Sequence, residues 1–355
     1  MMPKKRMQKR VRTMVGIVAI LRVITSMTTM LEIDSDALHS ITIGVIGDMP
    51  YTKNQQEDFL EFINALSADP KFNLVIHLGD IKGGDSPCSN EYMRWVRDTF
   101  NAYAGALVYT PGDNEWTDCH EGQDPRNPVE RLNVLRELFF YNPGITLGQR
   151  PRQVLTQCMV KNLAPCLVEN QVWLESGIVF GVVHVLGSNN GLDPWTQGVG
   201  TIAEQQKEFA LRLAADLLWL EKIFALTKER QSDIVILGMH ADMWNPNHST
   251  DGYSTIIQKL ADLTREFGKP VLLLQGDTHK FKVDQPLING DDLHGVTASV
   301  PNLTRIVVQG GSRNFLLEYL RITITPRHPN DVSPFFVERV TPGSGLPDAQ
   351  MRVSP

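Results

Sequence analysis

The chain has 355 residues, of which 42% are hydrophobic and 21% are charged, and its formal net charge is -6 at pH 7. This length and composition are typical of a globular protein with enough chain to bury a large core. Because the chain as a whole is acidic, we expect no broad surface for the phosphate backbone of nucleic acids.

The first 40 residues differ from the rest of the chain. Basic residues from Lys4 to Arg12 precede an apolar run from Met14 to Leu21, an order that resembles the basic and hydrophobic regions of a signal peptide. The segment from Val15 to Leu31 is too polar to be a clear membrane-spanning helix, because such a helix needs roughly 20 mostly apolar residues. We expect residues 1–40 to be a leader, either a signal peptide or an N-terminal membrane anchor, that exports the protein to the periplasm or the cell exterior. A disordered basic leader is the alternative.

From Ile41 onward, short apolar runs alternate with longer amphipathic stretches, which predicts an α/β fold. The predicted core strands cover residues 41–46, 73–78, 106–109, 177–185, 233–238 and 270–274. The predicted helices cover residues 55–66, 91–103, 129–139, 202–226 and 253–267. The helix from Ile202 is the clearest, because apolar residues recur along it every three or four positions.

The end of the chain has a different pattern. Shorter β-like runs follow at 304–309 and 317–324, and we expect them to be closing strands of the same domain.

In the middle of the chain, the region from about Asp118 to Pro165 contains Gly and Pro residues, and we expect it to be an irregular insertion over one face. Since no linker separates two cores, we expect one domain at 41–341 and a flexible tail at 342–355.

The four cysteines bear on the compartment of the protein. Their spacing pairs Cys88 with Cys119 and Cys158 with Cys166, and an even count at short separations suits an oxidising compartment. Four cysteines allow three connectivities, and four buried thiols are a further alternative.

Acidic residues and histidines lie just past the predicted strands. These residues are Asp48, Asp80, Asp113 with Asn114, His240, and Asp277 with His279. Strand-exit loops of an open α/β sheet converge on one crevice, which is where ligands bind. A single Asp after a strand is usually a turn residue or a helix cap. Five such loops that bring oxygen and nitrogen ligands to one edge are instead typical of a dinuclear metal site.

Five segments in order, GDMPY, HLGDIKGG, PGDNEW, GMHAD and GDTHK, resemble the sequence blocks of the calcineurin-like metallophosphoesterases. The resemblance spans about residues 41–280, and PGDNEWTDC and GSNNG further resemble an exported bacterial branch of that superfamily. It implies a four-layer α/β/β/α sandwich of two mixed β-sheets flanked by helices. It also implies two divalent metal ions as cofactors, with Mn, Fe, Zn and Mg all open.

The resemblance assigns roles by position. Asp80 resembles the carboxylate that bridges both metals, and Asp48 and His279 resemble ligands of the first metal. The implied ligands of the second metal are Asp113, His240 and Asp277. The implied reaction is hydrolysis of a phosphate mono- or diester by a metal-activated hydroxide, with catalytic residues Asn114, His240 and Asp80.

Four positions depart from the pattern of the family. Pro50 and Asp277 stand where the family usually has metal-binding histidines, and Asp113 stands at the usual Asn ligand. Asn114 replaces a His that contacts phosphate and assists the leaving group, and an amide cannot supply a proton as imidazole does. The site is therefore richer in oxygen, which favours harder ions such as Mn or Mg. The alternative function is a catalytically weakened protein of this fold that acts as a secreted binding or scaffold protein.

Two further histidines are candidates for contact with a phosphoester substrate beside Asn114. His184 lies at a second polar strand exit, although a histidine on a strand is more often a core residue. His120 is adjacent to Cys119, and a disulfide from there to Cys88 would tie its loop to the Asp80 loop.

Overall fold

The computed structural model describes residues 39–122, 124–311, 316–326, 333–343 and 349–353. Residues 1–38 of the expected leader lie outside the described residues. Within the described ranges, no helix is both long and apolar enough to cross a membrane.

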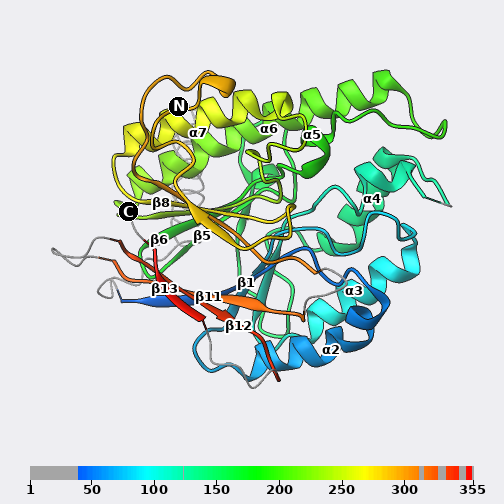
Figure 1. Cartoon of the computed structure of the whole chain (residues 1–355), viewed down its shortest axis with the longest axis horizontal. Coiled ribbons are helices and arrows are strands. Elements are labelled where there is room, and N and C mark those ends of the chain that lie inside the picture. The colour runs from blue at the N-terminus through cyan, green and yellow to red at the C-terminus, as the bar shows by residue number, and fades with distance from the viewer. Residues whose placement is uncertain (1–38, 123, 312–315, 327–332, 344–348, 354–355) are drawn as a thin grey trace, which may run out of the picture. The chain divides into compact units, whose positions relative to one another are not determined.

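The first sheet contains six strands in the order β13-β12-β11-β1-β2-β3 (Figure 1). Their bounds are β1 (Ile41–Ile46), β2 (Leu74–His77), β3 (Ala106–Tyr109), β11 (Tyr319–Ile324), β12 (Phe335–Val340) and β13 (Ala349–Arg352). The strands β1, β2 and β3 are parallel, whereas β11 pairs with β1 in antiparallel register. The three parallel strands therefore end at the same edge of the sheet.

The second sheet contains seven strands in the order β4-β5-β6-β7-β8-β10-β9. Their bounds are β4 (Leu155–Thr156), β5 (Gln171–Glu175), β6 (Ile178–Val182), β7 (Val235–Gly238), β8 (Val271–Gln275), β9 (Lys282–Asp284) and β10 (Leu303–Val307). The central strands β6, β7, β8 and β10 are parallel, and the flanking strands β5 and β9 are antiparallel to their neighbours. Both sheets are therefore mixed.

The two sheets pack face to face through one apolar cluster. Alternate side chains of β1 and β2, such as Val45 and Ile76, are buried together with Phe180, Ile236 and Leu272 of the second sheet. Successive side chains of a strand point to opposite faces, so each sheet also offers an apolar outer face to helices. These central strands are accordingly apolar on both sides.

Helices cover the outer face of each sheet, as the layers in Figure 1 show. The helices α2 (Lys53–Ala68), α3 (Asn90–Ala102) and α4 (Pro128–Phe139) pack on the first sheet. The helices α6 (Ile202–Glu229) and α7 (Ser254–Phe267) pack on the second sheet. The predicted α/β/β/α sandwich is confirmed.

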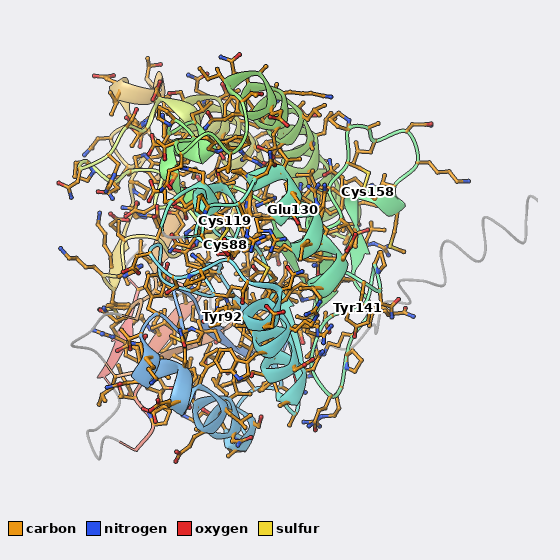
Figure 2. The ribbon with its side chains drawn as sticks, turned by 90° about the vertical axis from the view of Figure 1, so that its right-hand side faces the viewer. Cys88, Tyr92, Cys119, Glu130, Tyr141 and Cys158 are labelled. Carbon is orange, nitrogen blue, oxygen red and sulfur yellow. A yellow bond between two sulfur atoms is a disulfide. The ribbon has the colours of Figure 1, made fainter. Side chains whose placement is uncertain are left out.

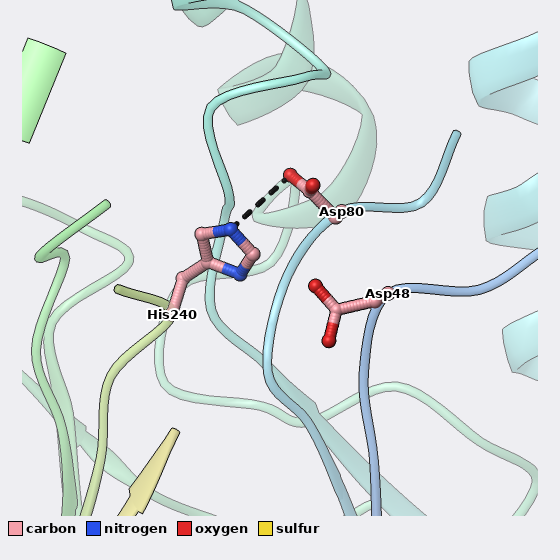
Figure 3. Close-up of side chains that lie close together, drawn as sticks. All are labelled: Asp48, Asp80 and His240. Carbon is pink, nitrogen blue, oxygen red and sulfur yellow. Dashed lines mark ion pairs between the residues drawn. The ribbon is translucent and has the colours of Figure 1, made fainter. Parts of the chain in front are cut away.

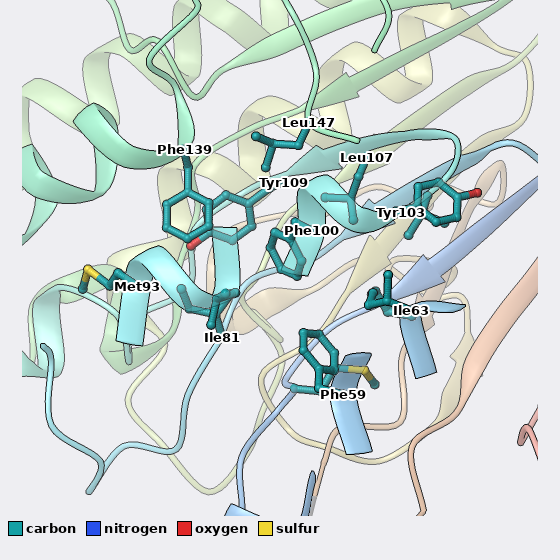
Figure 4. Packing of buried hydrophobic residues seen from close by; sticks show 14 of the residues in the cluster. Phe59, Ile63, Ile81, Met93, Phe100, Tyr103, Leu107, Tyr109, Phe139 and Leu147 are labelled. Atoms are coloured by element: carbon teal, nitrogen blue, oxygen red, sulfur yellow. The ribbon is translucent and has the colours of Figure 1, made fainter. Parts of the chain in front are cut away.

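A chain of aromatic rings fixes the helices to the end of β3 (Figure 4). Ring centroids lie 6.1 Å apart for Phe59 of α2 and Phe100 of α3, and 5.9 Å apart for Phe100 and Tyr109 of β3. Phe139 of α4 continues the chain, 4.9 Å from Tyr109. Such pairs add packing energy beyond their buried area, so the start of the loop after β3 is held rigidly.

The start of α2 also fixes a loop that is important below. Thr52 caps the helix by accepting a hydrogen bond from the backbone of Gln55, whose side chain accepts hydrogen bonds from the backbone of Thr52 and of Tyr51. This reciprocal capping box satisfies donors that a helix start leaves unpaired. The GDMPY segment is therefore clamped between β1 and α2.

Several elements differ from the sequence-based expectation. The region from Pro342, expected to be a flexible tail, contains β13, which pairs with β12 in antiparallel register. The segment GSNNG forms a short turn, α5 (Gly187–Gly191), and the region expected to be an irregular insertion contains the short strand β4 in addition to the predicted helix α4. Single turns of 3-10 helix complete the fold: η2 (Thr117–His120), η3 (Gln157–Met159), η4 (Asp251–Tyr253) and η5 (Asp292–His294).

Two disulfides join the cysteines as their spacing suggested. Cys88 is bonded to Cys119 and Cys158 to Cys166, with Cα atoms 5.8 Å and 5.0 Å apart. Figure 2 shows Cys88 and Cys119 side by side near Glu130 of α4, with Cys158 apart from them. The first disulfide therefore connects the loops that follow β2 and β3.

Candidate metal centre

The site lies where parallel strands of both sheets end. Asp48, Asp80 and Asp113 follow β1, β2 and β3, whereas His240 and Asp277 follow β7 and β8. Figure 3 shows Asp48, Asp80 and His240 pointing toward one another from separate loops. The face-to-face packing of the sheets thus brings both sets of strand exits to one point.

The distances define two overlapping groups of ligand atoms. The Nε2 atom of His240 lies 2.9 Å from Oδ1 of Asp113 and 3.4 Å from Oδ1 of Asp80. The first group is Asp48, Asp80 and His240, and the second is Asp113, His240 and Asp277, with the potential ligand atoms of each group within 4.8 Å of one another. The second group is the set that the resemblance implied for the second metal.

Three buried polar atoms in these groups, Asp48 Oδ2, Asp113 Oδ1 and His240 Nε2, have no hydrogen-bond partner in the described residues apart from the 2.9 Å ion pair between the last two. A buried polar atom without a partner is costly. Oxygen and imidazole nitrogen are ligands of divalent transition metals, so a cation at this point would satisfy all three atoms. The residues present therefore fit a metal centre.

The imidazole of His240 is already oriented for ligation. Its Nδ1–H donates a hydrogen bond to the carbonyl oxygen of Leu78, 2.7 Å away. This bond fixes the orientation of the ring and turns Nε2 toward the carboxylates, as is usual for histidines that bind metals.

Two glycines make the close approach of the loops feasible. A Cβ atom on Gly112 would lie 2.1 Å from Oδ1 of Asp80, and one on Gly276 would lie 2.7 Å from Oδ2 of Asp48. Each glycine thus gives space to an aspartate of a different loop. A side chain at either position would push a ligand out of place.

Four of the candidate ligands adopt the left-handed backbone conformation. The φ angles are 54° at Asp48, 56° at Asp80, 75° at Asp277 and 58° at His279. This region is sparsely populated by residues other than glycine and is found preferentially at functional sites. The surrounding hydrogen bonds hold these backbones in a strained shape that directs the side chains inward.

The buried carboxylates of the site repel one another, and a positive charge among them would reduce this repulsion. Burial raises the pKa of Asp80 well above its usual range, and the carboxylates of Asp113, Glu115 and Asp48 raise it further against the opposing effect of His240. Burial and Asp113 raise the pKa of Asp277 to about 7. Burial alone would lower the pKa of His240, but the carboxylates around it hold that pKa well above its ordinary value. Divalent cations would relieve this crowding of negative charge.

A cavity of about 350 Å³ opens over these ligands. Asp80, Asp113, Asp277 and His279 form its inner wall, and the loops around Asn189 and His248 belong to its outer wall. Its volume lies within the range of small-molecule sites.

A family model described as calcineurin-like phosphoesterase matches residues 41–281. The chain belongs to this family. Membership carries the general expectation of a metal-dependent phosphoesterase that acts on a phosphoester. No curated protein matches the chain.

One solved structure similar to this family member is titled "GAP50 the anchor in the inner membrane complex of Plasmodium". It is 11% identical, with 89% of each chain covered and a TM-score of 0.47.

Pro50 stands where the calcineurin-like phosphoesterases usually have a metal-binding histidine. In this chain the next residue, Tyr51, contacts the site instead. The hydroxyl of Tyr51 donates a hydrogen bond to Oδ2 of Asp80, and the ring of Tyr51 meets the ring of His279 edge to face at 4.5 Å. His279 places Nε2 3.7 Å from Oδ1 of Asp48. A phenol thus lies beside the first group of ligands.

Asn114 is tied to the site by several contacts. Its backbone N–H donates to Oδ1 of Asp80 at 3.1 Å, and its side-chain amide lies 2.6 Å from the hydroxyl of Tyr51 and 3.1 Å from the carbonyl of Lys82. Asn114 lines the cavity. It therefore both orients Asp80 and presents an amide to the space above it.

Three residues that support the ligands were not identified from the sequence. Oε1 of the buried Glu115 accepts hydrogen bonds from the backbone of Gly112 and of Asp80, at 2.7 Å and 3.2 Å. Ser188 donates to Oδ2 of Asp113 at 2.8 Å, and the backbone of Asp242 donates to Oδ2 of Asp277 at 3.0 Å. Their positions within PGDNEW, GSNNG and GMHAD were the available signal.

The structure gives the two additional histidines other partners. His184 is fully buried, with Nδ1 2.8 Å from Oε1 of Glu169, and its ring packs against Trp116. His120 is bonded through Nδ1 to Thr196 at 3.0 Å. Neither belongs to the described residues that line the cavity, so the structure does not bring them together with Asn114.

Proposed function

We propose that the protein is a metal-dependent phosphoesterase that binds two divalent ions through Asp48, Asp80, Asp113, His240, Asp277 and His279. The observation that carries this proposal is the convergence of three buried ligand atoms, from Asp48, Asp113 and His240, that have no hydrogen-bond partner among the described residues outside the ligand groups. Because four of the six side chains, Asp48, Asp80, Asp113 and Asp277, offer carboxylate oxygen, we infer a preference for Mn or Mg.

Divalent ions at this site would generate a nucleophile from water at neutral pH and neutralise charge on the phosphoryl group. The residues of the chain orient the reactants. The Asn114 amide and the Tyr51 hydroxyl lie at the cavity wall and both donate to Oδ2 of Asp80, so they hold this carboxylate in position beside the cavity. In the reaction a water oxygen bonds to phosphorus, the ester P–O bond breaks, and the departing alcohol oxygen takes up a proton.

Metal analysis and hydrolysis assays on the full chain test this proposal. We expect bound metal, and Mn-stimulated hydrolysis of an aryl phosphate mono- or diester. Asp80→Asn keeps the shape of the side chain but removes its charge, so hydrolysis should fall by roughly 100-fold or more. The exposed Asp58 of α2 offers a matched control in Asp58→Asn. Absence of both metal and hydrolysis would instead support a secreted binding or scaffold role. Pro50 and Asn114 favour that role, because they replace histidines that the family usually has.

We also propose that the protein is exported and belongs to the bacterial branch that its PGDNEWTDC and GSNNG segments resemble. The basic and apolar leader supports export, as do the two disulfides, which persist in oxidising compartments. Fractionation of cells that express the full chain should recover it outside the cytoplasm. Recovery in the cytoplasm with reduced cysteines would contradict this proposal.

A further inference from the structure

A row of three polar side chains begins at the cavity wall, outside the two groups of metal ligands. Thr250 lines the cavity, and its Oγ1 atom lies 3.1 Å from Nε2 of His294. The other ring nitrogen of His294, Nδ1, lies 2.6 Å from Oδ2 of Asp291. A hydroxyl, an imidazole and a carboxylate in this order form an arrangement that moves protons to and from hydroxyl groups in enzymes.

The imidazole of this row is buried and held in one orientation. The side chain of His294 is 2% exposed. Asp291 caps η5, and its Oδ1 accepts a hydrogen bond from the backbone N–H of His294 at 3.3 Å. The side-chain amide of Gln258, in α7, donates to the carbonyl oxygen of His294 at 2.6 Å. The ring therefore joins the carboxylate of Asp291 to the hydroxyl of Thr250.

Hydrogen bonds also connect this row to the second group of metal ligands. The Nε1–H of Trp244 donates to Oδ2 of Asp291 at 2.8 Å, and the backbone N–H of Trp244 donates to Oδ1 of Asp242 at 3.2 Å. The backbone of Asp242 in turn donates to Asp277. Thr250 and Asp277 line the same cavity. The row is therefore fixed to the part of the site where a phosphoester would bind.

The proposed reaction needs a proton donor for the departing alcohol. Asn114 stands where the family usually has a histidine that assists the leaving group, and an amide cannot supply a proton as imidazole does. An alkoxide is strongly basic, so it departs readily only if it receives a proton as the P–O bond breaks. A hydroxyl that is itself supplied with a proton by an imidazole can perform this transfer.

We propose that Thr250 is the catalytic residue that protonates the departing alcohol, and that His294 supplies the proton while Asp291 positions the imidazole. When protonated, His294 forms an ion pair with Asp291. As the P–O bond breaks, the departing oxygen takes the proton of Thr250 Oγ1, and Oγ1 takes the proton of His294 Nε2. His294 becomes neutral and regains a proton from solvent, which balances the proton that the attacking water releases. This inference rests on the proposed phosphoesterase function.

Two esters of similar size test the proton transfer. Benzyl phosphate releases an alkoxide that needs a proton, whereas the nitrophenolate of 4-nitrophenyl phosphate departs without one. Thr250→Val keeps the shape of the side chain but removes its hydroxyl. In the Mn-loaded full chain, this change should lower kcat/KM for benzyl phosphate by about 100-fold and for the nitrophenyl ester by about threefold or less. If only diesters are hydrolysed, the methyl diesters of the same alcohols replace these substrates.

Further variants separate proton transfer from packing. Thr250→Ser keeps a hydroxyl and should retain the wild-type ratio of the two substrates. His294→Gln can still form hydrogen bonds but cannot transfer a proton, so it should resemble Thr250→Val. Calorimetric Mn titration of Thr250→Val should give the wild-type affinity, which excludes loss of metal as the cause. Thr42→Val is the control, because the hydroxyl of Thr42 in β1 bonds to that of Thr323 at 2.8 Å and neither residue lines the described part of the cavity.

The inference and the proposed function fail in different ways. Equal losses with the two esters in Thr250→Val would assign Thr250 a packing role and overturn the inference. Unchanged hydrolysis of benzyl phosphate in that variant, or a wild-type protein that hydrolyses only the nitrophenyl ester, would also overturn it. In each of these cases the phosphoesterase function stands. If the metal-loaded wild-type protein hydrolyses neither ester, the proposed function itself is wrong.

Discussion

The backbone N–H of Asp277 donates a hydrogen bond to Oδ1 of Asp48 at 2.8 Å. Asp48 follows the first strand of one sheet and Asp277 follows a strand of the other. One carboxylate oxygen therefore joins the two sheets at the site, while the other, Oδ2, has no partner and faces the ligand cluster. Folding of the sandwich and assembly of the metal site depend on the same side chain.

Substitution of Asp48 separates these two roles. Asp48→Asn keeps an oxygen that can accept from Asp277 but removes the charge, whereas Asp48→Ala removes both. We expect Mn affinity to fall on the order of 100-fold in Asp48→Ala and by less in Asp48→Asn. Calorimetric Mn titration checks this, with Asp262→Asn on the exposed face of α7 as a control. Wild-type affinity in Asp48→Ala would exclude Asp48 as a ligand.

A buried arginine lies behind the ligands of the second sheet. Arg305 of β10 is 1% exposed and pairs with Asp242 and with Asp284. The backbone of Asp242 in turn donates to Asp277, and the guanidinium lies over the ring of Trp244 at 5.0 Å. Arg305 is therefore a positioning residue that acts on Asp277 through Asp242.

A second buried arginine supplies a matched control. Arg321 of β11 pairs with Asp69 and Glu338, so Arg305→Lys and Arg321→Lys each disturb a buried arginine that is paired with two carboxylates. Both variants should lower the melting temperature. Only Arg305→Lys should weaken Mn binding, by roughly 10-fold, since outer partners of ligands tune metal affinity. Equal Mn affinities in the two variants would rule out the link to Asp277.

The two disulfides should also differ in their effects. A model based on loop-closure entropy gives about 4 kcal/mol for the separation of 31 residues between Cys88 and Cys119. The same model gives about 2 to 3 kcal/mol for the separation of 8 between Cys158 and Cys166. We expect chemical denaturation of the two double Cys→Ser variants to follow this order.

The turnover number of the two double Cys→Ser variants should differ more clearly than their stability. The sulfur atoms of Cys88 and Cys119 lie 3.6 Å and 3.7 Å from the carbonyl oxygen of Asn114. Loss of this disulfide should therefore loosen Asn114 and lower kcat, whereas loss of Cys158–Cys166 should leave kcat unchanged. Identical kcat values in the two variants would argue against a brace at the site.

The sequence was sufficient to predict the central strands and the acidic strand exits, because parallel strands buried on both faces are continuous apolar runs. The strand β1 was predicted with its observed bounds, Ile41–Ile46. The last strands were harder. The sequence of β12, FFVERV, contains Glu338, which a sequence pattern places on the surface. In the structure Glu338 is buried because Arg321 and Lys71 pair with it. Such partners are distant in sequence and become apparent only in the fold.

The same reason explains which site residues were missed. Arg305 and Glu115 look like surface residues in the sequence, yet both are buried because their partners come from other loops. His184 follows a strand as the ligands do, but its side chain turns to Glu169. Position after a strand predicts that a residue is near the crevice. It does not predict the direction of the side chain.

A pH dependence follows from His77, which is buried beneath the site. Its Nε2–H donates to the carbonyl of Met49 at 3.0 Å and its Nδ1 accepts from the backbone of Gly79 at 3.2 Å, so the neutral ring fits both partners. Burial lowers the pKa of His77 to about 3, which outweighs the bond to Met49. The unfolded chain, with a pKa near 6.5, therefore binds a proton that the folded chain excludes.

The folded protein should therefore lose stability as the pH falls. The stabilisation is fully present above pH 6.5 and is lost progressively as pH falls toward about 3, because the folded pKa is the lower of the two. One proton contributes about 1.4 kcal/mol per pH unit to this slope. In His77→Gln, whose amide can still donate to Met49, the slope of the unfolding free energy between about pH 6 and about pH 4 should decrease by about that amount. The comparison is made with metal chelated, so that loss of ligands does not contribute, and an unchanged slope would show that His77 is protonated in the folded state.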